Sequence, residues 1–181
     1  SGWRAFLNHS HIRYDYIAYE QLANGKLSSR NYRVLILPYS IALSPEEVEH
    51  IKDFAASGGM VIADAKPGLM NEHCRPLDGW PLADVFGVSK PAVPGPEGKS
   101  ATAEEDETST RVADENLVLV SGRALADSGG VPLVVKNTFG QGTGIYLNFF
   151  LPADPNPQEV YPTLLKIFEK PDLEPEMEML S

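Results

Sequence analysis

The residues best placed to do chemistry begin at Asp64, where a short apolar segment ends in a turn. Enzymes that carry a cysteine or serine nucleophile beside a parallel sheet hold it on a sharp turn after a strand, near a histidine base. This turn reads Ala63-Asp64-Ala65-Lys66-Pro67 and contains neither nucleophile. The single cysteine, Cys74, lies further along the chain, and no histidine follows His73. A nucleophile, a histidine and an acid cannot be assembled in that order, so we expect no catalytic residue in this chain.

The loop after this turn is where we expect a ligand or a partner to bind. Residues 66–76 are polar and follow a predicted strand. Loops at the carboxyl ends of parallel strands are the usual binding sites of such sheets. The candidate ligand-binding or interface residues are Asp64, Lys66, Asn71, Glu72, His73 and Arg75.

Three further motifs have simpler structural interpretations. His73 and Cys74 are adjacent, and neither a second cysteine nor a paired histidine supplies ligand spacing, so we expect no metal site. Residues 139–144 are glycine-rich like a phosphate-binding loop, but a predicted strand follows them, so a hairpin turn is the better interpretation and we expect no cofactor. Carboxylate pairs suited to glycoside hydrolysis could be drawn from Asp64, Glu72 and Asp78, but any acidic protein offers such pairs.

Residues 34–63 predict a strand, a helix and a second strand. The run 34–37 is wholly apolar, which is typical of a strand buried on both faces of a parallel sheet. Ser44, Pro45 and Glu47 have the spacing of a capping box with proline at the first helical position. The apolar face of this helix comprises Val48, Ile51, Phe54 and Ala55. A glycine pair, 58–59, ends the helix before the second strand, 60–63.

Shorter patterns predict the remaining elements. They are a helix end at 3–8, a strand at 14–17, helical turns at 19–23 and 81–86, β segments near 117–120, 132–137 and 144–149, and a last helix at 158–169. A doubly wound sheet normally opens with a strand. No strand pattern precedes Trp3, so we expect the first strand to be missing and a longer protein to lie upstream of Ser1.

Composition indicates one α/β domain over residues 1–170. The 181 residues are 43% hydrophobic, which is enough for a full core. The net charge of -10 argues against nucleic acid or an acidic membrane surface as a partner, and no apolar run approaches the roughly 18 residues of a membrane span. The single cysteine excludes an internal disulfide and leaves the compartment open.

Two segments depart from this composition. Residues 89–110 contain prolines, glycines and the acidic run 104–107, so we expect a flexible acidic excursion. Residues 171–181 form an acidic tail, which we expect to be frayed.

Several motifs, in their order and spacing, resemble a known family. They are Tyr32-Arg-Val-Leu-Ile-Leu-Pro-Tyr39, the helix start at Leu43-Ser44, the glycine pair 58–59, the loop 68–73, the segment 82–88 and the closing hairpin 139–148. Together they resemble the amidotransferase-like middle domain, called the trimerisation domain, of bacterial β-galactosidases of glycoside hydrolase family 42. The match covers most of residues 14–170.

The resemblance implies a flavodoxin-like three-layer αβα sandwich of the class I glutamine amidotransferase type that has lost its amidotransferase chemistry. Its sheet would be mostly parallel, with a C-terminal β-hairpin. In that family the domain follows a catalytic barrel, helps to form a trimer and can help to wall a neighbour's sugar pocket. The catalytic acid and nucleophile reside on the barrel, and neither can be carried onto this chain.

The leading hypothesis is a noncatalytic accessory or oligomerisation domain of a larger glycoside hydrolase of the β-galactosidase type. Its partners would be an upstream catalytic domain, further copies and, at the substrate-adjacent loops, a carbohydrate. The alternative is a stand-alone small-molecule or sugar-binding or hydrolytic domain with its site at residues 64–75. A protein-interaction domain unrelated to sugars is a third hypothesis.

Overall fold

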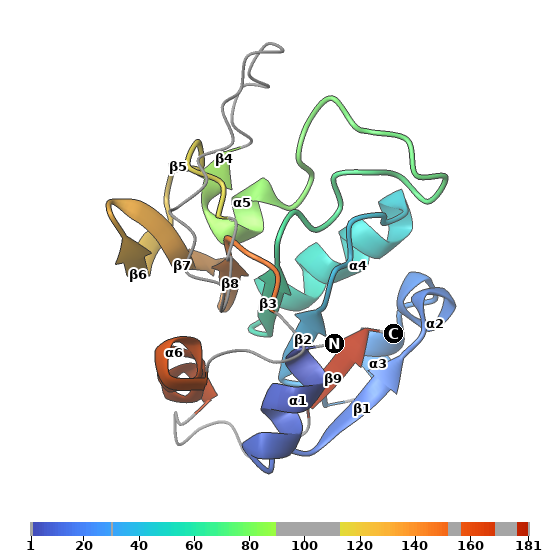
Figure 1. The fold of residues 1–181 in the computed structure, drawn as a ribbon. Coiled ribbons are helices and arrows are strands. Elements are labelled where there is room, and N and C mark those ends of the chain that lie inside the picture. The colour runs from blue at the N-terminus through green and yellow to red at the C-terminus, as the bar shows by residue number, and fades with distance from the viewer. Residues whose placement is uncertain (1, 30, 90–112, 152–156, 169–176, 181) are drawn as a thin grey trace.

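The computed structural model describes residues 2–29, 31–89, 113–151, 157–168 and 177–180 (Figure 1). The helices are α1 (Gly2–His9), α2 (Tyr19–Ala23), α3 (Lys26–Ser29), α4 (Pro45–Ala56), α5 (Ala83–Phe86) and α6 (Pro157–Phe168). The strands are β1 (Tyr14–Ile17), β2 (Val34–Leu37), β3 (Met60–Asp64), β4 (Val88–Ser89), β5 (Val118–Leu119), β6 (Arg123–Ser128), β7 (Val131–Phe139), β8 (Gly142–Leu147) and β9 (Met177–Leu180).

Seven strands form one mixed sheet in the order β1-β9-β2-β3-β8-β7-β6. The neighbours from β1 to β8 pair in parallel, whereas β8, β7 and β6 are antiparallel to one another. The predicted hairpin at 139–144 is confirmed, because Phe139 pairs with Gly142 and Gly140 turns the chain with a φ of 58°. The α/β class with a mostly parallel sheet and a closing hairpin is therefore confirmed.

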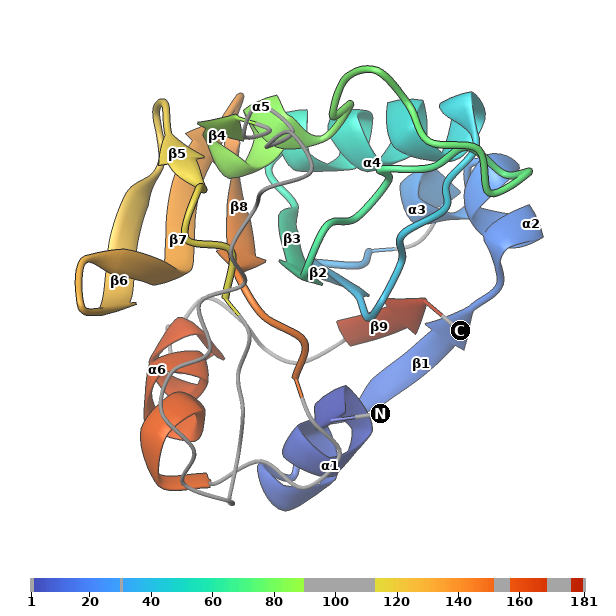
Figure 2. The ribbon, with the colours of Figure 1, turned by 45° about the horizontal axis from the view of Figure 1, so that its top comes forward.

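Helices cover both faces of this sheet (Figure 2). One buried cluster joins Leu35, Leu37, Val61 and Ala63 to residues of α2, α4 and α5. A second cluster joins Val34, Ile36, Ile62 and Ile145 to residues of α1 and α6. Successive residues of a strand point to opposite faces, so a strand that is apolar at every position has to be covered twice.

The predicted strand, helix and strand at 34–63 are confirmed with their local chemistry. The Ser44 hydroxyl accepts a hydrogen bond from the Glu47 N–H at 3.2 Å, and the Ser44 N–H donates to the Glu47 carboxylate at 2.7 Å. These two bonds satisfy amides that would otherwise lack partners at the start of α4. Ile51 and Ala55 of α4 are fully buried, with Val48 and Phe54 packed beside them.

Two expectations about strands need correction. β6 was not predicted, because it pairs with β7 across a register shift and is mostly exposed, so its residues lack a clean alternating pattern. The prediction of a frayed tail is wrong for residues 177–180, which form β9 between β1 and β2. A short segment with weak strand propensity is ordered there because both neighbours offer it backbone hydrogen bonds. Most of the predicted excursion at 89–110 lies outside the described residues.

Candidate functional site

The carboxyl ends of β2, β3 and β8 meet at one edge of the sheet, as the strand positions predicted. Leu37 pairs with Ala63, which pairs in turn with Tyr146. The segments that leave these strands therefore lie side by side, and they bring Tyr39, Asp64, Lys66 and Phe150 to this carboxyl edge.

Asp64 is a buried hydrogen-bond acceptor for three separate segments. Only 3% of the residue is exposed. Its Oδ1 accepts the Tyr39 N–H at 2.6 Å. Its Oδ2 accepts the Trp3 indole N–H at 3.0 Å and the Leu151 N–H at 3.3 Å. One carboxylate thus ties α1 and the chain after β2 and β8 to the end of β3.

Burial raises the pKa of the Asp64 carboxyl above its ordinary value, although the hydrogen bonds from Tyr39, Leu151 and Trp3 act in the opposite direction. A buried carboxylate with a raised pKa is a common feature of active sites. Here both of its oxygens already accept bonds from the protein. The arrangement suits a residue that holds the fold together better than one that receives a substrate.

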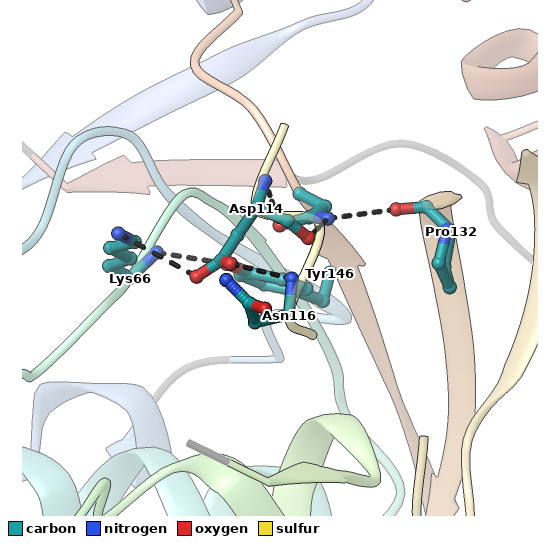
Figure 3. A network of polar contacts seen from close by, with 6 residues as sticks. Lys66, Asp114, Asn116, Pro132 and Tyr146 are labelled. Atoms are coloured by element: carbon teal, nitrogen blue, oxygen red, sulfur yellow. Dashed lines mark hydrogen bonds and ion pairs between the residues drawn. The ribbon is translucent and has the colours of Figure 1, made fainter. Parts of the chain in front are cut away.

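Lys66 lies in the turn that follows β3. Its φ of 62° lies in the left-handed region, which a residue with a side chain adopts at a cost. Its backbone N–H donates to the Tyr146 hydroxyl at 3.3 Å, and its Nζ lies 3.8 Å from Oδ2 of Asp114 (Figure 3). The strained turn is present, but it carries an ammonium group that is half exposed and paired with a carboxylate.

Asn148, which the sequence analysis did not single out, holds Asp114 in place. Its Oδ1 accepts the Asp114 N–H at 3.2 Å, and its Nδ2 donates to the carbonyls of Asp114 at 2.8 Å and Pro132 at 2.9 Å. Figure 3 shows the resulting network around Lys66, Asp114 and Tyr146. The sequence feature that could have identified Asn148 is its place directly after an apolar strand, because a buried amide there needs hydrogen-bond partners.

An exposed aromatic pair lies at the same edge and was also missed. The rings of Tyr39 and Phe150 have centroids 4.6 Å apart, with 64% and 43% of the residues exposed. Tyr39 has a φ of 54°, and the Asp64 carboxylate holds its N–H. The buried acid therefore fixes the backbone that presents this pair.

The remaining predicted site residues lie on a separate exposed turn. The Asn71 side-chain oxygen accepts the N–H groups of His73 at 3.0 Å and Arg75 at 2.9 Å. Nε2 of His73 lies 3.3 Å from Oε1 of Glu72. The turn is held beside the start of α4 by the pairing of Met70 with Ala42. Within the described residues, no hydrogen bond or ion pair joins this turn to Asp64 or Lys66.

Two hollows of the surface lie away from this turn and from the carboxyl edge. One of about 560 Å³ lies between α4 and residues 77–84, beside the 2.9 Å ion pair of Lys52 and Asp84. Another of about 430 Å³ lies near α3 and the end of α4. The described ranges contain no group of three acidic, histidine or cysteine side chains placed to hold a metal ion. No helix in those ranges is long and apolar enough to cross a membrane.

Known proteins share sequence and fold with this chain. The family described as the β-galactosidase trimerisation domain matches residues 4–170. The β-galactosidase BgaB of Geobacillus sp. strain Y412MC61 is 30% identical over an alignment of 164 residues, and the match covers 82% of this chain and 23% of that protein. The chain therefore spans less than a quarter of the length of this curated relative.

Solved structures share the fold at lower identity. Gan42B, a β-galactosidase of glycoside hydrolase family 42 from G. stearothermophilus, has a TM-score of 0.58 at 23% identity over 80% of this chain and 22% of its own. A cytoplasmic protein, STM1381, of Salmonella typhimurium LT2 has a TM-score of 0.56 at 18% identity over 93% of this chain and 86% of its own. On the family match over residues 4–170 and the BgaB identity, the chain belongs to the family of β-galactosidase trimerisation domains, as its motifs predicted.

Proposed function

We propose that this chain is a noncatalytic domain that assembles copies of a larger glycoside hydrolase acting on β-galactosides. The observation that carries the proposal is the turn after β3. This turn carries Lys66, paired with Asp114, in the place of a nucleophile. Both carboxylate oxygens of the neighbouring Asp64 already accept hydrogen bonds from N–H groups of the protein. Catalysis in the larger protein then belongs to another part of the polypeptide.

The same proposal includes the finer fold type, a flavodoxin-like sandwich derived from an amidotransferase ancestor. Helices on both faces and four successive parallel pairings support it. The strained turn at Lys66 supports the ancestry, because hydrolytic relatives of this architecture hold a nucleophile on such a turn.

Two exposed surfaces are the candidates for contact with another copy. The first is the aromatic pair Tyr39 and Phe150, because exposed aromatic residues on a rigid backbone are typical of interface hot spots. The second is the turn that carries Asn71, Glu72 and Arg75, where exposed charges can set the orientation of a partner or reach a sugar.

The test is made in the multidomain protein that carries this domain. Light scattering should show a smaller mass for the double variant Tyr39→Ala, Phe150→Ala, and Ala substitutions at Asn71, Glu72 and Arg75 should lower the mass or raise the KM. The matched control is the exposed Val120→Ala, which should change neither. Unchanged mass and unchanged KM in every variant would contradict the proposal.

A stand-alone binding or hydrolytic domain is the second candidate. The observation that favours it is the Salmonella protein, since a similar fold there makes up 86% of a whole chain. That likeness concerns the fold alone. Saturable binding or turnover of a β-galactoside by this chain by itself, lost in Lys66→Ala, would support the second candidate over the first.

A further inference from the structure

The hollow of about 560 Å³ between α4 and residues 77–84 has the size and the lining of a small-molecule site. Ligand pockets typically measure about 300–1,000 Å³ and combine apolar walls with a few polar groups. The hollow lies on the face of the sheet that α4 and α5 cover (Figure 2). Its lining includes the apolar residues Leu77, Trp80 and Pro81 and the charged residues Lys52, Asp78 and Asp84.

Interior contacts hold the walls of this hollow in place. The Trp80 indole N–H donates to the Pro67 carbonyl at 2.7 Å, and its ring packs edge-on against Tyr146, with centroids 5.3 Å apart. Nδ2 of the buried Asn137 donates to the carbonyls of two residues of α5, at 2.9 and 3.1 Å, and so holds this helix against the sheet. A site whose walls are already fixed loses little conformational entropy when a ligand binds.

Charges of both signs line the hollow. Nζ of Lys52 on α4 lies 2.9 Å from Oδ2 of Asp84 on α5, and their side chains are 32% and 54% exposed. Asp78 adds a second exposed carboxylate. An anion would meet two carboxylates here, and a cation would have to displace the Lys52 ammonium from Asp84. The lining therefore favours a neutral ligand that both donates and accepts hydrogen bonds.

Sugar hydroxyls have this property. A hydroxyl donates one hydrogen bond and accepts others, and neighbouring hydroxyls of a sugar ring lie about one hydrogen-bond length apart. One hydroxyl can donate to the Asp84 carboxylate while its neighbour accepts from the Lys52 ammonium, and hydrogen bonds to charged groups are the stronger ones. The C–H face of the same ring can cover the apolar surface of Trp80 and Pro81.

Gly79 leaves open space in this lining. A Cβ added at Gly79 would meet no heavy atom within 4 Å. A larger side chain at this position would therefore occupy the hollow without disturbing the packed core. This gives a substitution that blocks the hollow and leaves its walls intact.

We propose that this hollow is a binding site for a neutral sugar, which the Lys52 and Asp84 pair holds against the apolar wall at Trp80. The site is separate from the predicted loop at residues 64–75 and from the two surfaces proposed for contact with another copy. Binding here needs neither assembly nor a catalytic domain. Only the choice of a β-galactoside as the first probe rests on the proposed function.

The test is a titration of the isotope-labelled chain with lactose and, separately, with methyl β-D-glucopyranoside, followed by NMR. We expect at least one sugar to cause saturable shifts of the Lys52, Gly79 and Trp80 signals. Gly79→Leu should weaken this binding about tenfold by filling the space, and Asp84→Asn should weaken it about tenfold by removing a charged acceptor. The control is the exposed Asp127→Asn, which should leave the binding unchanged.

Three results would overturn the proposal. They are the absence of saturable shifts with either sugar, binding that persists in Gly79→Leu, and equal shifts with inorganic phosphate, which would contradict a neutral ligand. Binding that is lost in Lys66→Ala and kept in Gly79→Leu would place the sugar at the carboxyl edge instead. The mass of the assembled protein is a separate measurement, so the failure of this site and the failure of the assembly proposal can be distinguished.

Discussion

Asp64 and the exposed turn at residues 71–75 belong to one polar stretch of sequence, yet they differ in burial, partners and purpose. Asp64 is buried and accepts three hydrogen bonds from segments that are remote in sequence. The turn is bonded mainly to itself, through the Asn71 oxygen, and it exposes Glu72, His73 and Arg75. One is a structural acceptor, whereas the other is a surface that can meet a partner.

Polar residues that hold a fold can be told apart from those that remain available to a ligand or a partner. Both groups follow the same strand and contain residue types suited to chemistry. The separation lies in whether a polar atom is already satisfied inside the protein, since a saturated buried group has no capacity left for a ligand. Substitutions that change one group at a time can therefore confirm or reverse this assignment.

The largest expected effect follows from Asp64→Ala. It leaves three N–H donors without their acceptor, two of them on loops and one on the buried Trp3. We expect a loss of about 3 kcal/mol in the free energy of unfolding, measured by urea denaturation. The exposed Asp78→Ala is the control and should change it by less than about 0.5 kcal/mol. Equal losses in the free energy of unfolding for the two variants would show that Asp64 behaves like an exposed residue.

The pH dependence of Asp64→Asn is the second test. Because burial raises the pKa of Asp64, the folded state binds the proton more tightly than the unfolded state. This contribution to stability is complete below the ordinary pKa of about 3.9 and is lost as the pH rises through the higher folded pKa. The stability gap between wild type and variant should therefore narrow from pH 4 to pH 7. A gap that widens over that range would mean that the folded state prefers the ionised form.

Substitutions at Lys66 test whether the turn between Asp64 and residues 71–75 is strained. Lys66→Gly relieves a φ of 62° and loses only a long ion pair, whereas Lys66→Ala loses the pair and keeps the strain. We expect the glycine variant to be more stable than the alanine variant by about 1 kcal/mol. Thermal unfolding of both variants measures this difference. A more stable alanine variant would show that the backbone there is not strained.

The smallest effects are expected on the exposed turn. Asn71→Ala removes the acceptor for two backbone N–H groups that water can reach, so a loss of about 1 kcal/mol is expected. Arg75→Ala serves as the control and should change stability by less than about 0.5 kcal/mol. A loss at Arg75 comparable to that at Asp64 would remove the distinction between the two regions.

Elements whose signals are local could be predicted from the amino-acid sequence. The apolar run of β2, the capping box at Ser44 and Glu47, the glycine turn at 140 and the strand ending at Asp64 were all predicted from neighbouring residues. The ordered motifs also identified the family, which the match over residues 4–170 confirms. These features depend on backbone propensity and on spacing within a few residues.

The partners and the burial of each polar residue depend on the folded arrangement of remote segments. Trp3, Tyr39 and Leu151 are far from Asp64 in sequence, so their convergence on one carboxylate could not be derived from spacing. The same holds for Asn148 and Asp114, and for β9, which lies between β1 and β2 although its own residues favour no strand. Burial and hydrogen-bond partners arise from contacts remote along the chain, and those contacts exist only in the folded molecule.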